Sequence, residues 1–196
     1  MGGEDHKTGQ ADDAEPRWAR LEAWTRARVP IDRVVFRWSG EVMEPVDRIG
    51  LIGRNPNDHD NVFIVTGDTG SLYAPTRVRL RATPAFLGEA ANMAAQYADW
   101  LTPGEVRTID AIPRGGGAVI RRGLTKVAVH RDEHGTVHEC SAVCPHLGCI
   151  VDWNAAERTW DCPCHGSRFD ARGGVLNGPA MRDLGESRAE DQRRAS

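Results

Sequence analysis

Hydrophobic residues near the N-terminus recur at the spacing of one helical face. Trp18, Leu21 and Trp24 follow one another at intervals of three, with arginines between them, and Pro16 stands near the start of the pattern. Proline is favoured in the first turn of a helix, where its missing N–H is not needed. The pattern predicts a short amphipathic helix over Glu15–Val29.

Three short runs of β-branched and aromatic residues come next. They are separated by turns rich in Gly, Pro and Asn, and they cover Arg33–Trp38, Arg48–Gly53 and Asn61–Gly67. Such runs predict strands. These strands are too few to close a sheet by themselves.

A second helical pattern covers Thr83–Thr102. Thr83 can cap the helix, Pro84 fits its first turn, and an apolar stripe recurs at helical spacing. The members of this stripe are Phe86, Ala90, Met93, Ala94, Tyr97 and Leu101. We expect the stripe to pack into a core.

From Gly104 the pattern changes to short strands with frequent turns. Asp132–Gly135 predicts a hairpin turn between two of them. The expected strands cover residues 118–122, 125–131, 136–140, 150–153, 159–162 and 167–170. They predict a compact all-β unit, and residues after Leu184 have no apolar anchor and are expected to form a disordered tail.

Composition narrows the class of protein. The chain of 196 residues is 40% hydrophobic and 27% charged, with a net charge of −3, so no basic surface indicates nucleic acid. The first twenty residues lack the apolar region of a signal peptide, and no apolar run is long enough to span a membrane. We therefore expect a cytoplasmic protein, where cysteines more often bind metal or carry redox chemistry.

All five cysteines lie within residues 140–164. Cys144 is followed by His146 and Cys162 by His165, so two turn-like segments each offer one sulfur and one imidazole. Four such side chains from two loops suit a metal centre, and zinc would accept them.

A zinc site with four ligands would not use Cys149 and Cys164. They are placed so that a disulfide could tie the two ligand loops together. In a cytoplasmic protein such a bond could be protected by burial, or the pair could be reduced.

The segments "CPHLGC" (144–149) and "CPCHGS" (162–167) resemble the two boxes of the Rieske [2Fe–2S] family. The resemblance implies that Cys144 and Cys162 hold a buried iron, while His146 and His165 hold an outer iron through neutral imidazole. Two imidazoles in place of two thiolates remove negative charge, so reduction occurs at about −150 to +300 mV rather than about −400 mV. The resemblance thus implies an electron relay.

Residues around the cluster also follow the family pattern. The segment "NGPA" (177–180), with Gly178 and Pro179, resembles the loop that covers the cluster, and Ser167 can donate to a bridging sulfur. Phe169 stands where quinol-oxidising members have a tyrosine that hydrogen-bonds to a ligand sulfur. Fewer donors destabilise the reduced cluster, so we expect a lower potential than in those members.

The first part of the chain resembles the C-terminal portion of FAD-dependent oxidoreductases of the glycine/D-amino-acid oxidase type. The segments that carry the resemblance are residues 2–9 and 50–70. Some of those enzymes carry a C-terminal Rieske domain joined by a helix ending "NMAAQYADWLTPGE", as here. The resemblance implies that the turn of Gly67, Asp68, Thr69 and Gly70 would approach the flavin.

No G-x-G-x-x-G follows any strand, so the phosphate-binding turn of a dinucleotide fold is absent from the sequence. We expect the last portion of a longer oxidoreductase, with an incomplete flavin site and no FAD bound by this chain alone. The expected α+β organisation is an oxidoreductase fragment (1–82), a linker helix (83–103), an all-β Rieske domain (104–186) and a tail (187–196).

The leading hypothesis is one-electron transfer through a [2Fe–2S] cluster, as part of or partner to an FAD-dependent oxidoreductase. A Rieske ferredoxin or oxygenase-type carrier is one alternative, and a structural zinc module is another. We expect the remaining residues to be structural: a buried Cys140, solvated histidines at His130, His134 and His138, and packing aromatic rings at Trp153 and Trp160.

Overall fold

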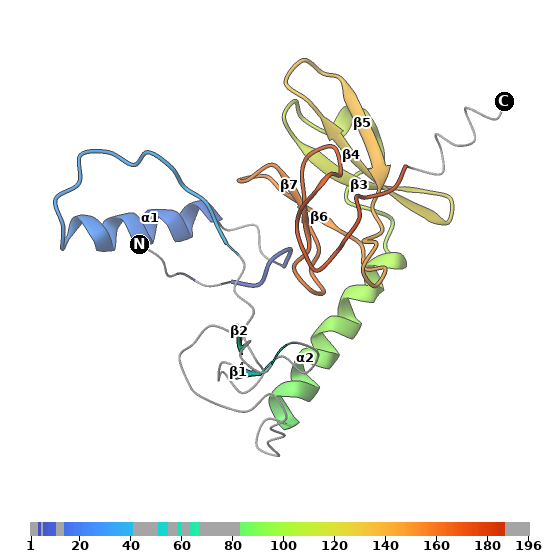
Figure 1. The fold of residues 1–196 in the computed structure, drawn as a ribbon. Coiled ribbons are helices and arrows are strands. Elements are labelled where there is room, and N and C mark those ends of the chain that lie inside the picture. Colours follow the sequence, from blue (N-terminus) through green and yellow to red (C-terminus); the bar gives the residue numbers. More distant parts are fainter. Residues whose placement is uncertain are drawn as a thin grey trace. The chain divides into compact units, whose positions relative to one another are not determined.

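The structure is a computed structural model that describes residues 4, 6–10, 14–40, 51–54, 59, 63–66 and 83–186. The chain divides into two compact units (Figure 1). One consists of Met1–Trp38 together with Gln96–Ser196, and the other of Ser39–Ala95.

The described residues of the smaller unit include two strands and a helix. β1 (Leu51–Arg54) pairs antiparallel with β2 (Phe63–Thr66), and α2 covers Thr83–Gln96. Strands and a helix were expected at these places. The turn of residues 67–70, expected to approach a flavin, lies outside the described residues.

Two expectations for the part of the chain before Gly104 are wrong. Arg33–Trp38 is described without a strand, and the side chain of Phe36 is exposed. Phe86 and Leu101, expected to pack in a core, are also exposed. Helical spacing identifies an apolar face but does not supply a surface for that face to meet. The N-terminal helix was predicted correctly and is α1 (Ala14–Arg26).

The larger unit contains two antiparallel sheets. In the first, β4 (Thr125–Arg131) lies between β3 (Gly117–Arg122) and β5 (Val137–Ser141). The turn after β4 joins it to β5 as the sequence predicted. Three consecutive residues of β3 and five of β4 are buried, so the sheet is covered where these strands cross the core.

The second sheet has four strands in sequence order. They are β6 (Asp152–Asn154), β7 (Thr159–Asp161), β8 (Arg168–Phe169) and β9 (Val175–Asn177). Two short 3-10 helices, η2 (Tyr97–Trp100) and η3 (Ile109–Ala111), precede the sheets in the chain.

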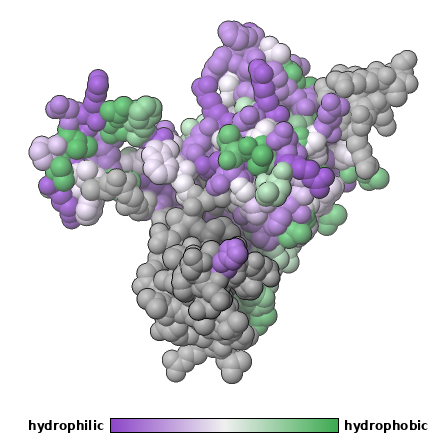
Figure 2. All heavy atoms as spheres, viewed as in Figure 1, coloured by the Kyte–Doolittle hydropathy of each residue, from purple (hydrophilic) through white to green (hydrophobic). Residues whose placement is uncertain are grey.

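Aromatic side chains connect the two sheets. Trp160 of β7 and Phe169 of β8 are fully buried, and the Trp160 ring meets the Trp153 ring edge-on at 4.9 Å. Gly117 of β3 lies directly against the Trp153 ring, because a Cβ there would collide with it. The packing role expected for both tryptophans is confirmed. Outside the core, Figure 2 shows a mainly hydrophilic face with small hydrophobic groups.

The three histidines around the hairpin differ in environment. His134 is exposed at the turn, while His130 of β4 stands opposite His138 of β5. His130 is buried, its Nδ1 lies 2.9 Å from the Gly116 carbonyl oxygen, and its ring stacks on Trp153 at 5.0 Å. The expectation of solvated histidines is therefore wrong for His130, because β4 runs through the core.

Candidate metal centre

Two loops of closely similar backbone geometry contain the cysteine and histidine motifs. We call them loop 1 (residues 144–149) and loop 2 (residues 162–167). In each loop the glycine N–H, from Gly148 or Gly166, donates to the carbonyl oxygen of the first cysteine at 2.9 Å. Both glycines have a φ of 79°, a conformation that favours glycine. The repeated Cys-Pro-x-x-Gly order therefore builds the same tight turn twice.

A second backbone bond closes each loop. The Cys144 N–H donates to the Cys149 carbonyl oxygen at 2.9 Å, and the Cys162 N–H donates to the Ser167 carbonyl oxygen at 2.8 Å. In such a turn the backbone hydrogen bonds are made within the loop, so the cysteine and histidine side chains are available to bind a metal. The two loops can therefore present ligands to a common point.

The sulfur atoms of Cys144 and Cys162 face each other. A hydrogen bond from the Cys162 thiol lowers the pKa of Cys144 to about 6, with further donation from the His146 N–H and the Ser167 hydroxyl. The same hydrogen bond raises the pKa of Cys162, and burial raises it further. Two such thiols readily lose one proton, and a cationic centre between them would stabilise loss of the second.

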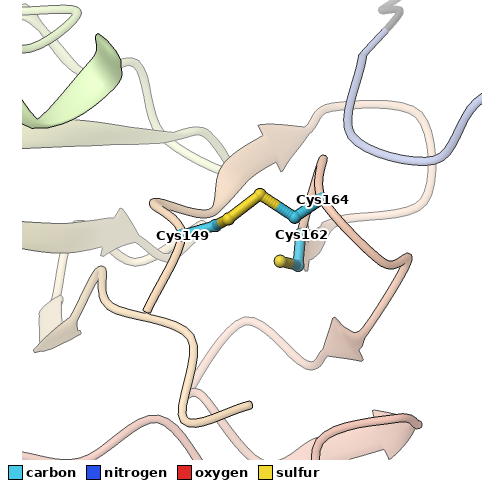
Figure 3. A group of neighbouring side chains, drawn as sticks. All are labelled: Cys149, Cys162 and Cys164. Atoms are coloured by element: carbon cyan, nitrogen blue, oxygen red, sulfur yellow. A yellow bond between two sulfur atoms is a disulfide. The ribbon is translucent and has the colours of Figure 1, made fainter. Parts of the chain in front are cut away.

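Cys149 and Cys164 form a disulfide, which joins loop 1 to loop 2 as the sequence suggested (Figure 3). The sulfur of Cys162 lies within 4.8 Å of both sulfurs of this bond. Because a disulfide consumes both thiols, these three cysteines are not a three-ligand metal site. Cys140 is buried and lies outside the disulfide, as expected.

The two histidines of the loops also lie together. The ring centroids of His146 and His165 are 4.8 Å apart, with the rings nearly perpendicular. Burial, and then the neighbouring His146, lower the pKa of His165, which favours the neutral imidazole that binds metals. Among the described residues, Nδ1 of His165 is the one buried side-chain nitrogen or oxygen that lacks a hydrogen-bond partner.

This donor set fits a [2Fe–2S] cluster of mixed ligation. It offers two facing sulfurs that share a proton, two adjacent imidazole rings and one buried nitrogen without a partner. A buried polar atom without a partner destabilises a fold, so such atoms call for an explanation. A metal bound at Nδ1 of His165 would supply one.

A buried ion pair joins the two ends of loop 2, and no pattern in the sequence predicted it. Asp161 precedes the loop and Arg168 follows it. Arg168 Nε and Nη2 donate to the two Asp161 carboxylate oxygens at 2.9 and 3.0 Å. Asn154 and Thr159 donate to the same carboxylate at 2.9 Å each. The pairing depends on the β7–β8 register, which local patterns do not specify.

The segment expected to cover the cluster contacts loop 2 through Ser167. The Ala180 N–H donates to Ser167 Oγ at 2.9 Å, and the hydroxyl of Ser167 donates to the Cys144 sulfur. Gly178 and Pro179 are half-buried, and Phe169 is fully buried. Ser167 therefore links this segment to loop 1, and its expected donation to a bridging sulfur stays a prediction.

A segment from the N-terminus also contacts loop 2. Gln10 Nε2 donates to the Pro163 carbonyl oxygen at 2.7 Å. Gly9 has a φ of 70°. A Cβ there would lie 2.8 Å from the Pro163 backbone nitrogen and 2.9 Å from the Asp161 backbone carbonyl oxygen. Only glycine can pack so closely against this backbone.

An open cavity of about 440 Å³ lies beside these N-terminal residues. It is lined by Gly9, Gln10, Gln96, Glu105, Asp152, Trp153, Asn154 and Asp161. Burial and the neighbouring carboxylates of Glu105, Asp99 and Asp161 raise the pKa of Asp152 to about 7. The cavity is therefore acidic, and the charge on Asp152 depends on pH.

The described part of the chain contains no helix with the length and apolarity needed to cross a membrane.

Comparisons with known proteins relate these loops to one family. The family described as "Rieske [2Fe-2S] domain" matches residues 101–188. The chain is 31% identical to the Bacillus subtilis (strain 168) protein YhfW, named as a Rieske 2Fe-2S iron-sulfur protein, over 93% of this chain and 41% of YhfW. It is also 48% identical to the cytochrome b6-f complex iron-sulfur subunit 1 of Nostoc sp. (strain PCC 7120), over 35% of this chain and 38% of that subunit.

Among solved structures, the plasma membrane Rieske protein PetC3 from Synechocystis PCC 6803 is similar at a TM-score of 0.37 and 35% identity. The match covers 43% of this chain and 85% of that chain. The chain spans about two fifths of the length of the curated relatives named above. The chain is a Rieske [2Fe–2S] domain protein, with the domain at residues 101–188, and a domain of this family binds one [2Fe–2S] cluster.

Proposed function

We propose that the chain transfers single electrons through one [2Fe–2S] cluster held by Cys144, Cys162, His146 and His165. The observation that carries this proposal is the meeting of two facing sulfurs and two adjacent imidazoles on paired turns. When bound, the cluster supplies a one-electron redox centre whose potential is raised by imidazole ligation.

The surroundings of the four side chains support this role. Cys144 and Cys162 are almost fully buried, whereas His146 is exposed and His165 is half-buried. Thiolates shielded from water hold a cluster firmly, and exposed imidazole edges offer a path for electrons to a docked partner. The disulfide keeps the two ligand loops together.

The first test is the identity of the metal. Purified chain should contain two irons and two sulfides per protein, absorb visible light and show a rhombic EPR signal after reduction. Zinc without iron would indicate a structural zinc module instead and would overturn the proposal.

The second test is the ligand set. Cys144→Ser and His146→Ala should abolish the rhombic signal, because each removes one ligand to an iron. Cys140→Ser and His134→Ala are the matched controls, since both residues lie outside the loops and should leave the signal unchanged. A signal that survives loss of Cys144 or His146 would contradict the proposed ligands.

We further propose that the electron partner is an FAD-dependent oxidoreductase, either the rest of a longer chain or a separate protein. The alignment with YhfW over 93% of this chain extends well beyond the Rieske domain and supports a shared larger architecture. A cytoplasmic site of action belongs to the same proposal, and cell fractionation tests it.

The flavin proposal is tested by anaerobic mixing. The oxidised chain is combined with a D-amino-acid oxidase and D-alanine, and reduction of the cluster is followed by absorption. Rapid reduction supports a flavin donor. If dithionite reduces the cluster but the flavoprotein does not, a ferredoxin-type carrier with another donor is favoured. A fluorescence titration with FAD should show no binding to the chain alone.

A further inference from the structure

The 3-10 helix η2 holds loop 1 from outside the two sheets. Side chains at i and i+3 of a 3-10 helix lie on the same side, so Tyr97 and Trp100 point in one direction. Tyr97 Oη donates to the Leu147 carbonyl oxygen at 2.7 Å. Trp100 Nε1 donates to the Gly148 carbonyl oxygen at 2.9 Å. Two consecutive carbonyls, directly after His146, are thus bound by two aromatic donors.

These bonds continue into the turn of loop 1. The carbonyl that Tyr97 binds belongs to the same peptide unit as the Gly148 N–H, which donates to the Cys144 carbonyl oxygen at 2.9 Å. A donor at one end of a peptide unit strengthens donation at the other end. The Tyr97 hydroxyl therefore reinforces the bond that closes the turn between Cys144 and Gly148.

The two aromatic residues are anchored differently. Trp100 is half-buried and packs against the core that contains Trp160 and Phe169. Tyr97 is 37% exposed, so its hydrogen bond to loop 1, rather than burial of its ring, is its most specific contact. The backbone of Gln96, directly before η2, is also helical.

We propose that Tyr97 and Trp100 are positioning residues for the cluster. They fix loop 1 so that Cys144 and His146 face loop 2, and their donor dipoles raise the potential of the bound cluster. This inference rests on the proposed ligand set. The sequence pattern assigned Tyr97 only to a packing stripe, and Trp100 had no role.

The test uses Tyr97→Phe and Trp100→Phe, which remove the donors and keep a ring. Without cluster, we expect the Gly148 amide to exchange its hydrogen about two- to tenfold faster in Tyr97→Phe, the factor that loss of one hydrogen bond gives. With cluster, we expect a lower midpoint potential and broader EPR lines in both variants, because loop 1 holds His146 less rigidly.

Two controls match these changes. Trp24→Phe makes the same replacement as Trp100→Phe, in α1. Leu101→Ala alters the exposed neighbour of Trp100 and keeps the Leu101 carbonyl that accepts from Arg121. Both controls should leave the amide exchange, the potential and the EPR line width unchanged.

Unchanged exchange and unchanged potential in both variants would overturn the inference. If Trp100→Phe does not fold, Tyr97→Phe decides alone, since Tyr97 is partly exposed. A wild-type chain without a rhombic signal would count against the proposed function, while amide exchange in the apo protein would still decide whether η2 fixes loop 1.

Discussion

Loop 1 and loop 2 have the same backbone turn but are held in different ways. The flanks of loop 1 are joined by a single antiparallel bridge between Val143 and Ile150, and its carbonyls accept bonds from η2. The flanks of loop 2 are joined by the bidentate Asp161–Arg168 ion pair, between strands β7 and β8. A shared sequence motif therefore fixes the turn, and separate supports fix where each turn sits.

Because the two loops are held differently, we expect substitutions near loop 1 and near loop 2 to have different effects. Loop 2 depends on a network inside the sheet, so damage to it should affect folding. Loop 1 depends on Tyr97 and Trp100 of η2, which lie outside both sheets. Loss of these hydrogen bonds should therefore change the properties of the cluster more than the folding of the domain. Four changes test or extend this comparison.

The largest effect is expected from Asp161→Ala. Removing one partner of a buried ion pair leaves the other charge uncompensated and typically costs about 3–5 kcal/mol. Glu157 still accepts a bond from Arg168 at 2.7 Å, so we expect a loss of about 3 kcal/mol in the free energy of unfolding, measured by urea denaturation.

Glu133→Ala is the matched control, because its ion pair with Arg158 is exposed on both sides. It should cost less than about 1 kcal/mol. Equal stability of the two variants would show that the buried pair does not hold loop 2.

The next effect is expected from loss of the disulfide between the loops. The bond spans a sequence separation of 15, for which chain entropy predicts about 3 kcal/mol. Cys149→Ser, Cys164→Ser and the double variant should lose nearly the same stability by thermal denaturation, since each removes the same bond. Additive losses would mean that the two cysteines act independently.

A smaller change is expected on the loop 2 side from Phe169→Tyr. A new donor to a ligand sulfur worth about 1 kcal/mol would raise the one-electron potential by about 40 mV. Protein-film voltammetry measures the shift. Phe86→Tyr adds the same hydroxyl on the exposed face of α2 and should not move the potential. A potential that fails to rise would contradict the assigned role of Phe169.

The last change concerns the acidic surroundings of loop 2. Because the folded-state pKa of Asp152 is raised to about 7, the folded protein binds a proton there that the unfolded chain has released. The free energy of unfolding should therefore fall as pH rises from about 4 to 7. Asp152→Asn should flatten this decline in denaturation curves, and Asp110→Asn should not. An identical decline in all three proteins would exclude Asp152 as its source.

Local motifs explain most of what the sequence predicted correctly. In this chain the Cys-Pro-x-x-Gly order forms the same tight turn twice, and the Asp132–Gly135 turn joins β4 to β5, so both loops and the β4–β5 pair could be expected. The ligand assignment to Cys144, His146, Cys162 and His165 stays a prediction until the metal is measured.

Pairings between distant residues explain the failures. Asp161 meets Arg168 because β7 and β8 take one register, and Tyr97 meets Leu147 across 50 positions of sequence. No periodicity within either segment encodes such contacts. The exposed face of α2 is the converse case, where a correct helical pattern did not identify its environment.

The close packing of Gly9 on loop 2 affects how residues 101–188 could be joined to another chain. The family match begins at residue 101, yet Gly9, more than ninety positions before that start, packs directly on the backbone of loop 2. If residues 101–188 were joined to another upstream sequence, the Pro163 backbone would lose this cover. The new sequence would have to place a glycine at the same point to restore it. Upstream residues of this chain therefore form part of the support of loop 2, although they lie outside the family match.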